Sequence, residues 1–207
     1  MKRLCIVCFF DREGIVDKSV EYLLGELRRN SDRLLIVVNG SIQADSKKIL
    51  EAYSKDVIVR ENVGYDAGAY KFAMFKYLKI EEIRQYDELI LCNDTFIGPF
   101  VPFKDIFDTM EKRKCDWWGI NGVDWKFMPV IQSYFLVFNK SIIQDDKFLE
   151  YWEQNIDEYT CCLEDVYAQF ETGLFYYLTQ VEKRKYSVYV PENNCNIYSR
   201  VSVSIKK

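Results

Sequence analysis

Residues 4–38 read LCIVCFFDREGIVDKSVEYLLGELRRNSDRLLIVV, and this stretch decides the fold class. It holds an uninterrupted apolar run, Leu4–Phe10, a segment with leucines at helical spacing, Val16–Arg29, and a second apolar run, Leu34–Val38. Apolar runs that alternate with amphipathic helices are typical of a parallel sheet whose two faces are both covered. We therefore predict an α/β fold with a mainly parallel central sheet, arranged as a Rossmann-type sandwich.

The alternation continues along the rest of the chain. Further helices are expected at Asp45–Ser54, from the Gly64 turn to about Leu78, and at Phe103–Lys112, Ile142–Gln154 and Leu163–Glu182. Further strands are expected at Val57–Arg60, Glu88–Cys92, Asp116–Ile120, Gln132–Asn139 and Tyr186–Val190. No repeat, low-complexity tract or linker interrupts the 207 residues, so we expect one domain over residues 1–207.

The composition excludes several classes of function. A formal charge of −4 argues against a nucleic-acid binder, which normally carries a basic excess. Short basic clusters lie near expected helix ends, where the helix dipole favours cations: Arg28-Arg29, Lys112-Arg113-Lys114 and Lys183-Arg184-Lys185. Contact of the last cluster, and of Lys206-Lys207, with anionic lipid at the inner face of the plasma membrane remains an open alternative.

The chain has no apolar run of 18 or more residues, so we expect no membrane-spanning helix. The run after Met1-Lys2-Arg3 is seven residues long and lacks a small-residue cleavage site, which favours a buried strand over a signal peptide. Seven scattered cysteines are typical of a reduced, cytoplasmic protein. The lack of histidine excludes imidazole chemistry and leaves acid–base work to carboxylates, Tyr, Cys or Lys.

Polar residues follow three of the expected strands. They are Asp11 after the first strand, Asn62 with the Gly64–Gly68 turn after the third, and Asn93-Asp94-Thr95 after the strand Glu88–Cys92. Ligands of open α/β sheets bind beyond the carboxyl ends of the strands. If these strands are parallel, the three polar groups meet at one edge of the sheet and predict a binding site there.

Each group also has an ordinary structural interpretation. Gly64 and Gly68 flank Asp66 just before a helix, so their amides could approach an anionic ligand, or they could form a turn capped by Asn62 or Asp66. Asp94 at a strand tip could hold a divalent cation between two phosphates, or it could serve a turn.

Several motifs in order carry a resemblance to a known family. They are Arg60–Tyr70, Leu91–Thr95 with Gly98-Pro99, Trp118–Ile120, Gln132–Phe135 and Phe170–Leu174. Together they closely resemble the rhamnan synthesis F family, which are GT-A-like glycosyltransferases of bacterial surface polysaccharide assembly. The resemblance covers about Leu4 to Leu178 and implies a GT-A-like fold. Residues from about 1 to 100 would form the nucleotide-sugar half, and residues from about 101 to 207 the acceptor-side half.

The resemblance implies a nucleotide-sugar donor, plausibly dTDP-rhamnose, and a glycan or lipid-linked glycan acceptor such as a cell-surface polysaccharide or lipopolysaccharide. Asp94 would take the metal position of the DXD motif and bind Mn²⁺ or Mg²⁺, although Cys92 stands where that motif has its first Asp. The donor pocket would be lined by Asp11, Asn62, Gly64, Asp66, Gly68 and Asn93. Gln132, Ser133 and Tyr134 would edge the acceptor side.

Inverting sugar transfer needs a base for the acceptor hydroxyl. Glu164, Asp165 and Glu171 are the candidates on the acceptor side, and Glu171 is preferred because it lies in the family motif. Glu164 and Asp165 could equally be first-turn acids of a helix. The tryptophans Trp117, Trp118 and Trp125 could stack on sugars but are more often core residues.

Two other functions stay open on the sequence. A sugar nucleotidyltransferase would share the sheet and a metal-binding acid, but such enzymes usually carry an early Gly-rich, basic loop, where this chain has Asp11-Arg12-Glu13-Gly14. A non-catalytic nucleotide- or glycan-binding module of a polysaccharide assembly system would also fit a chain with a single acid in the DXD position.

Overall fold

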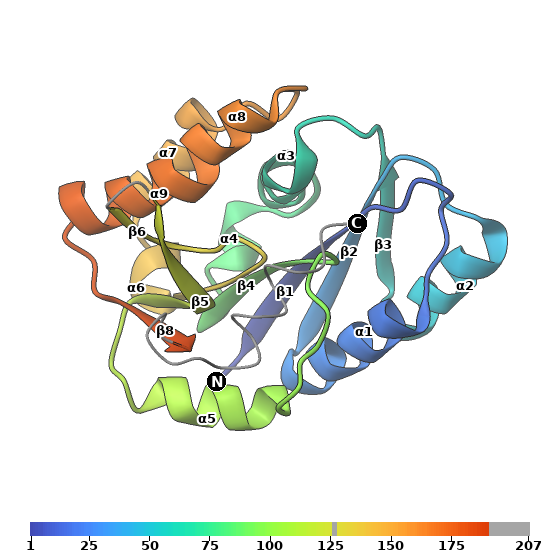
Figure 1. The fold of residues 1–207 in the computed structure, drawn as a ribbon, viewed down its shortest axis with the longest axis horizontal. Coiled ribbons are helices and arrows are strands. Elements are labelled where there is room, and N and C mark those ends of the chain that lie inside the picture. Colours follow the sequence, from blue (N-terminus) through green and yellow to red (C-terminus); the bar gives the residue numbers. More distant parts are fainter. Residues whose placement is uncertain (126–127, 191–207) are drawn as a thin grey trace.

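The computed structural model describes residues 1–125 and 128–190 (Figure 1). Its centre is an eight-stranded sheet with the order β3-β2-β1-β4-β7-β5-β6, in which β8 also pairs with β5. The strands are β1 (Arg3–Phe9), β2 (Arg33–Asn39), β3 (Asp56–Arg60), β4 (Glu88–Asn93), β5 (Trp117–Trp125), β6 (Met128–Ile131), β7 (Phe135–Asn139) and β8 (Tyr186–Val190).

The first four strands form a parallel half-sheet. β1 pairs in parallel with β2 and with β4, and β2 pairs in parallel with β3. The carboxyl ends of β1, β2, β3 and β4 therefore lie at one edge. β7 is antiparallel to both β4 and β5, so β5 runs in the same direction as the first four strands. The predicted α/β fold with a mainly parallel sheet is confirmed.

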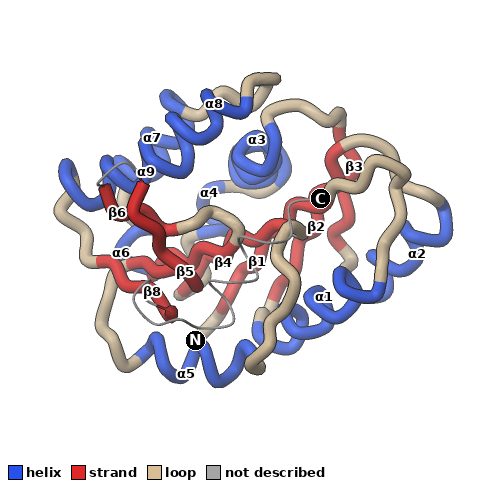
Figure 2. Tube along the Cα trace, in the orientation of Figure 1, coloured by secondary structure: helices blue, strands red, loops and turns tan. Residues whose placement is uncertain are grey.

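Helices cover both faces of the sheet. The helical segments are α1 (Lys18–Asn30), α2 (Ala44–Tyr53), α3 (Tyr65–Phe72), η1 (Ala73–Tyr77), α4 (Ile80–Ile83), α5 (Phe103–Glu111), α6 (Lys140–Ile143), α7 (Asp146–Asn155), α8 (Leu163–Val166), η2 (Tyr167–Glu171), α9 (Thr172–Tyr176) and η3 (Tyr177–Val181), where η marks π-helical turns. Figure 2 shows α1, α2 and α5 on one side and α3, α7, α8 and α9 on the other. Among the described residues, no helix is long and apolar enough to cross a membrane.

The two faces follow from the alternation of side chains along each strand. Along β1, Ile6 and Cys8 join the core under α3 and α7, whereas Val7 and Phe9 join the core under α1 and α5. All four are at most 3% exposed. A central parallel strand is covered on both faces, so its run is continuously apolar rather than alternating.

The structure corrects three expectations. The expected strand Gln132–Asn139 is a strand only from Phe135, because residues 132–134 form a loop after the hairpin of β5 and β6. The expected helix Ile142–Gln154 is two helices, and Asp145 caps the second by accepting from the amide of Lys147. Trp117 and Trp118 are 1% and 2% exposed, so they are core residues without a sugar-stacking role; the side chain of Trp125 lies outside the described part.

Candidate active site

Asn93, the last residue of β4, connects two of the predicted motifs at the carboxyl edge of the sheet. Its Nδ2 donates to Asp66 Oδ2 at 2.8 Å, and its Oδ1 accepts from Thr95 Oγ1 at 2.6 Å. The Thr95 bond fixes the orientation of the amide, so the NH₂ group faces Asp66. Asp66 lies in the first turn of α3, where its Oδ1 accepts from the amide of Ala67.

The acceptor-side loop joins the same set. The amide of Asn93 donates to the carbonyl of Tyr134 at 3.1 Å, and the amide of Ser133 donates to Glu171 Oε1 at 3.3 Å. Gln132 lies at the start of this loop, where its Oε1 accepts from Asn121 Nδ2. Hydrogen bonds thus connect Asp66 to Asn93, Asn93 to the loop at Tyr134, and the neighbouring loop residue Ser133 to Glu171. Residues that are more than 100 positions apart in the sequence meet here.

Glu171 and Asp66 are the acids with raised pKa values in this group. Burial raises the pKa of Glu171 to about 7; the charge of Asp66 adds to the rise, while the bond from Ser133 opposes it. Burial also raises the pKa of Asp66, against the bonds from Asn93 and Ala67. Tyr167, one helical turn before Glu171, has a raised pKa from partial burial and then from the charges of Glu171 and Asp66. Tyr167 and Glu171 are the first and last residues of η2, four positions apart, so the two lie on the same side of this helical segment.

Asp94 lies beside the end of β1. Its amide donates to the carbonyl of Cys8 at 3.2 Å, and its Oδ2 accepts from the amide of Phe10 at 3.3 Å. The buried thiol of Cys8 has a pKa raised first by burial and then by the charges of Asp66 and Asp94. Both carboxylates therefore lie close to Cys8, and Asp94 belongs to the same site as Asp66.

The described residues do not form a metal cage of their own, because no group of three or more His, Cys, Asp or Glu among them could hold an ion. Mg²⁺ and Mn²⁺ are also bound in sites where the protein supplies one or two carboxylates and the substrate phosphates supply further ligands. Asp94, with Asp66 nearby, fits a site of this kind.

The two glycines of the turn have a packing role that the sequence did not indicate. Gly64 has φ +69°, and a Cβ at this position would overlap the carbonyl of Glu158. At Gly68 a Cβ would lie 2.8 Å from the same oxygen. The amide of Gly64 donates to the carbonyl of Thr160. In the structure, the backbone that approaches these glycines closely is the loop after α7, so their role in donor binding stays a prediction.

Arg60 and Asn39 belong to the site as well, although the sequence analysis placed Arg60 in a motif without giving it a role and did not single out Asn39. Arg60 donates from Nη1 to Asn39 Oδ1 and to the carbonyl of Val63, both at 3.0 Å, and from Nη2 to the carbonyl of Glu158 at 3.4 Å. Asn39 in turn donates from Nδ2 to the carbonyl of Tyr65. This cation holds the turn before Asp66 in place. The sequence feature that could have identified this pair is Asn39 itself, because it is a polar residue at the end of a buried strand.

The remaining predicted residues lie around this centre. Asp11 follows β1, and its Oδ1 accepts from the amides of Glu13 and Ile15, so it shapes its own loop. Asn62 is exposed, and its Cβ is 3.5 Å from where a Cβ of Gly40 would lie, at the end of β2. Glu164 and Asp165 are exposed in the first turn of α8, where Asp165 Oδ2 accepts from Thr160 Oγ1. Of the three candidate bases, Glu171 alone hydrogen-bonds to the acceptor-side loop in the described contacts.

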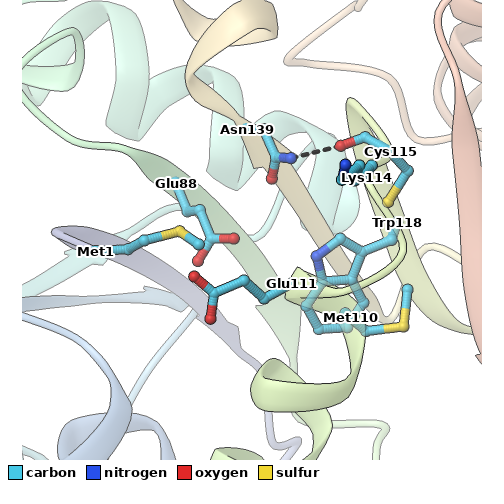
Figure 3. A pocket seen from close by; sticks show the side chains of 8 residues that line it. All are labelled: Met1, Glu88, Met110, Glu111, Lys114, Cys115, Trp118 and Asn139. Atoms are coloured by element: carbon cyan, nitrogen blue, oxygen red, sulfur yellow. Dashed lines mark hydrogen bonds between the residues drawn. The ribbon is translucent and has the colours of Figure 1, made fainter.

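Two cavities lie away from this centre. One of about 50 Å³ is at the amino-terminal edge of β1 and β4, where Glu88 and Glu111 point into the same space and Asn139 donates to the carbonyl of Cys115 (Figure 3). The other, of about 380 Å³, lies between η1 and the segment after α7. Its Lys71 donates to the carbonyls of Glu153 and Ile156, so it is engaged in capping α7.

Known proteins similar to this chain include two curated bacterial proteins. The virulence protein VirA of Vibrio anguillarum is 29% identical over 187 residues, which cover 85% of this chain and 56% of that protein. The protein y4gN of Sinorhizobium fredii is 25% identical over 154 residues, which cover 73% of this chain and 39% of that protein. The chain therefore spans about half or less of the length of these relatives.

A solved structure with a similar fold is 4-diphosphocytidyl-2C-methyl-D-erythritol synthase of Anaerococcus prevotii. It is 16% identical, with a TM-score of 0.58, over 98% of this chain and 95% of that one. At this identity the similarity establishes the α/β fold alone. The model of the family described as rhamnan synthesis protein F matches residues 34–199, which include every candidate site residue except Asp11. The chain belongs to the rhamnan synthesis protein F family.

Proposed function

We propose that this chain is a glycosyltransferase that moves a sugar from a nucleotide-sugar donor to a glycan acceptor. The observation that carries the proposal is the position of Glu171. It is a largely buried carboxylate with a pKa of about 7, and it is joined by hydrogen bonds to the strand tip that holds Asn93 and Asp94. A base works best when its pKa lies near the working pH, because it is then ionised and still takes up a proton readily.

The proposed reaction is an inverting displacement. The oxygen of an acceptor hydroxyl attacks the anomeric carbon of the donor sugar, and the bond from that carbon to the diphosphate oxygen breaks. The hydroxyl proton moves to Glu171, and the nucleoside diphosphate leaves with the electron pair of the broken bond. Tyr167, whose pKa is raised first by burial and then by the charges of Glu171 and Asp66, would line the acceptor side of the reacting sugar.

The carboxyl edge would hold the donor. Asp66, held by Asn93 and by the amide of Ala67, would accept hydrogen bonds from hydroxyl groups of the donor. Asp94 would hold a divalent ion together with the diphosphate oxygens, and such an ion supplies positive charge to the leaving group. A single carboxylate such as Asp94 fits an ion that takes most of its other ligands from the substrate phosphates and water.

The family description supports a finer proposal for the substrate. The family is named for rhamnan synthesis, so we take rhamnose, carried as dTDP-rhamnose, as the donor sugar. A growing cell-surface polysaccharide or lipopolysaccharide would be the acceptor. The cytoplasm, where nucleotide sugars are made, would be the site of action.

A panel of nucleotide sugars with Mn²⁺ present tests this function. We expect dTDP-rhamnose to bind and to release dTDP when a rhamnose-containing oligosaccharide is added. Binding of the nucleotide sugar without release of dTDP, across a panel of glycan acceptors, would favour a non-catalytic module of a polysaccharide assembly system instead.

The fold shared with 4-diphosphocytidyl-2C-methyl-D-erythritol synthase supports a second candidate, a sugar nucleotidyltransferase. In that reaction a sugar phosphate attacks a nucleoside triphosphate and pyrophosphate leaves. The loop after β1 opposes this candidate, because Arg12 is its one basic residue and Asp11 is engaged in forming the turn. Release of pyrophosphate from a triphosphate and rhamnose 1-phosphate, with no release of dTDP from dTDP-rhamnose, would decide for the nucleotidyltransferase.

A further inference from the structure

Two basic segments that are far apart in the sequence lie side by side at the amino-terminal edge of β5 and β8. Residues 111–116 lead from α5 to β5, and residues 182–185 lead from η3 to β8. The amide of Asp116 donates to the carbonyl of Lys185 at 2.7 Å, and the amide of Lys185 donates back to Asp116 Oδ2 at 2.8 Å. Figure 1 shows the green loop after α5 and the red loop before β8 on the same side of the molecule.

The two segments together carry an excess of positive charge. Of their ten residues, six are basic and three are acidic. The acids are already engaged in part: Glu182 pairs with Lys147, and Asp116 accepts from Ser141 as well as from Lys185. Arg184 pairs with Asp145, and Arg113 donates to backbone carbonyls of β8.

Four exposed lysines remain, and we call them the lysine face: Lys112, Lys114, Lys183 and Lys185. Of these, Lys114 also lines the small cavity that Glu88 and Glu111 enter. All four are exposed, and over residues 1–125 and 128–190 none of them forms an ion pair. The carbonyl ends of α5 and η3 offset part of this charge through their dipoles, and the exposed Glu111 offsets about one further unit. The charge of four lysines exceeds two half-charges and one carboxylate together, so the face stays positive.

Apolar side chains flank the lysine face. Val181 is 54% exposed and Tyr186 is 41% exposed, immediately before and after the second segment. The ring of Tyr186 packs on Trp117 and Phe175, so it is held in place at the surface. Lysines beside an exposed aromatic and an aliphatic residue are the combination that binds the headgroup region of an anionic bilayer.

We propose that the lysine face docks this protein on an anionic phospholipid surface. The charge complementarity is local, because the chain as a whole carries −4. The exposed Val181 and Tyr186 favour a lipid surface over a nucleic acid, which offers no apolar layer for them. The candidate active site lies at the carboxyl edge of the parallel strands, so docking through the opposite edge would leave that site open. This inference does not depend on the proposed function.

The test is co-sedimentation with vesicles at low salt. We expect the protein to bind vesicles of equal parts phosphatidylcholine and phosphatidylglycerol, and not vesicles of phosphatidylcholine alone. The variant with Lys112→Gln, Lys114→Gln, Lys183→Gln and Lys185→Gln should partition at least about tenfold less onto the anionic vesicles. The matched control replaces Lys18, Lys47, Lys48 and Lys104 by Gln, which changes the net charge equally at other exposed sites and should keep most of the binding.

If the fourfold variant does not fold, the double variant Lys112→Gln with Lys185→Gln is tested in its place. This double variant leaves Lys114 and Lys183, which have positive φ, unchanged. It should still lose several-fold in binding. Equal binding of the fourfold variant and the wild type would overturn the proposal, as would equal binding of the wild type to neutral vesicles. Tighter binding of the wild type to single-stranded RNA than to anionic vesicles would also contradict the lipid assignment.

Discussion

At the residue scale, the carboxylate of Glu171 combines burial with one hydrogen bond from the part of the chain that the structure describes, donated by the amide of Ser133. Burial disfavours its ionised form and raises its pKa from 4.5 to about 7. The folded state therefore holds this proton more tightly than the unfolded state. Stability that is present below about pH 4.5 is lost as the pH rises towards 7.

Replacing Glu171 by Gln should remove this loss, because the amide keeps an oxygen for Ser133 and carries no charge. At pH 8 we expect the variant to be more stable than the wild type by about 1–3 kcal/mol, and at pH 4.5 we expect little difference. Urea unfolding at the two pH values measures both quantities. An equal effect of the substitution at both values would mean that Glu171 is not held in a desolvating site.

A second prediction concerns Asp94. If this carboxylate holds a divalent ion together with the diphosphate, Mn²⁺ strengthens the binding of a nucleoside diphosphate, and Asp94→Ala removes that gain. Calorimetric titration with and without Mn²⁺ measures it. Asp45→Ala removes an exposed acid on α2 and should keep the full metal effect. If Mn²⁺ still strengthens nucleoside diphosphate binding in Asp94→Ala, Asp94 does not hold the ion, and its role is limited to its contacts with β1.

The sequence identified the candidate site residues, but it did not predict how they contact one another. Strand-tip polarity pointed to Asn93 and Asp94, and the family resemblance pointed to Asp66 and Glu171. The bond from Asn93 to Asp66 could not be predicted, because it depends on the orientation of one amide group. The raised pKa of Glu171 could not be predicted either, since burial comes from segments distant in the sequence.

At the scale of elements, the turn before α3 is shaped by a loop that the sequence did not connect with it. Gly64 has a positive φ and lies against the backbone of Glu158, and Arg60 donates to the same carbonyl. Local sequence can predict a glycine turn, but it cannot predict which segment packs against it. The sequence analysis therefore predicted that a ligand approaches the glycines of this turn closely, whereas in the structure the backbone of residues 158–160 does so.

Gly64→Ala should destabilise the protein by more than about 2 kcal/mol, because alanine disfavours positive φ and its Cβ would overlap Glu158. Gly25→Ala in α1 is the control. A Cβ there meets its nearest atoms at 3.6 Å, so the change should be neutral or should add up to about 1 kcal/mol through helix propensity. Thermal unfolding of both variants tests this difference. Equal stability of the two variants would contradict the packing role of Gly64.

At the scale of the whole molecule, the parallel half-sheet could be predicted and the antiparallel part could not. The elements from β1 to β4 are linked by helices, and such connections give parallel neighbours. β7 and β5 are also buried runs, but burial on both faces says nothing about strand direction. The short hairpin of β5 and β6 has no alternating pattern of apolar and polar residues, so the sequence did not reveal its antiparallel strands. The site depends on both parts, because Asp94 directly follows β4 while the loop before β7 reaches Glu171.

The central claim is that the site formed by Asp66, Asn93 and Glu171 transfers a sugar, with Glu171 as the base. The most direct measurement is the rate of nucleoside diphosphate release from the nucleotide sugar and acceptor, compared between Glu171→Gln, Asp165→Asn and the wild type. We expect Glu171→Gln to keep donor binding and to lower the rate by at least about a hundredfold. Asp165→Asn, which alters an exposed residue of α8, should cost less. Loss of transfer in Asp165→Asn with activity retained in Glu171→Gln would contradict this account.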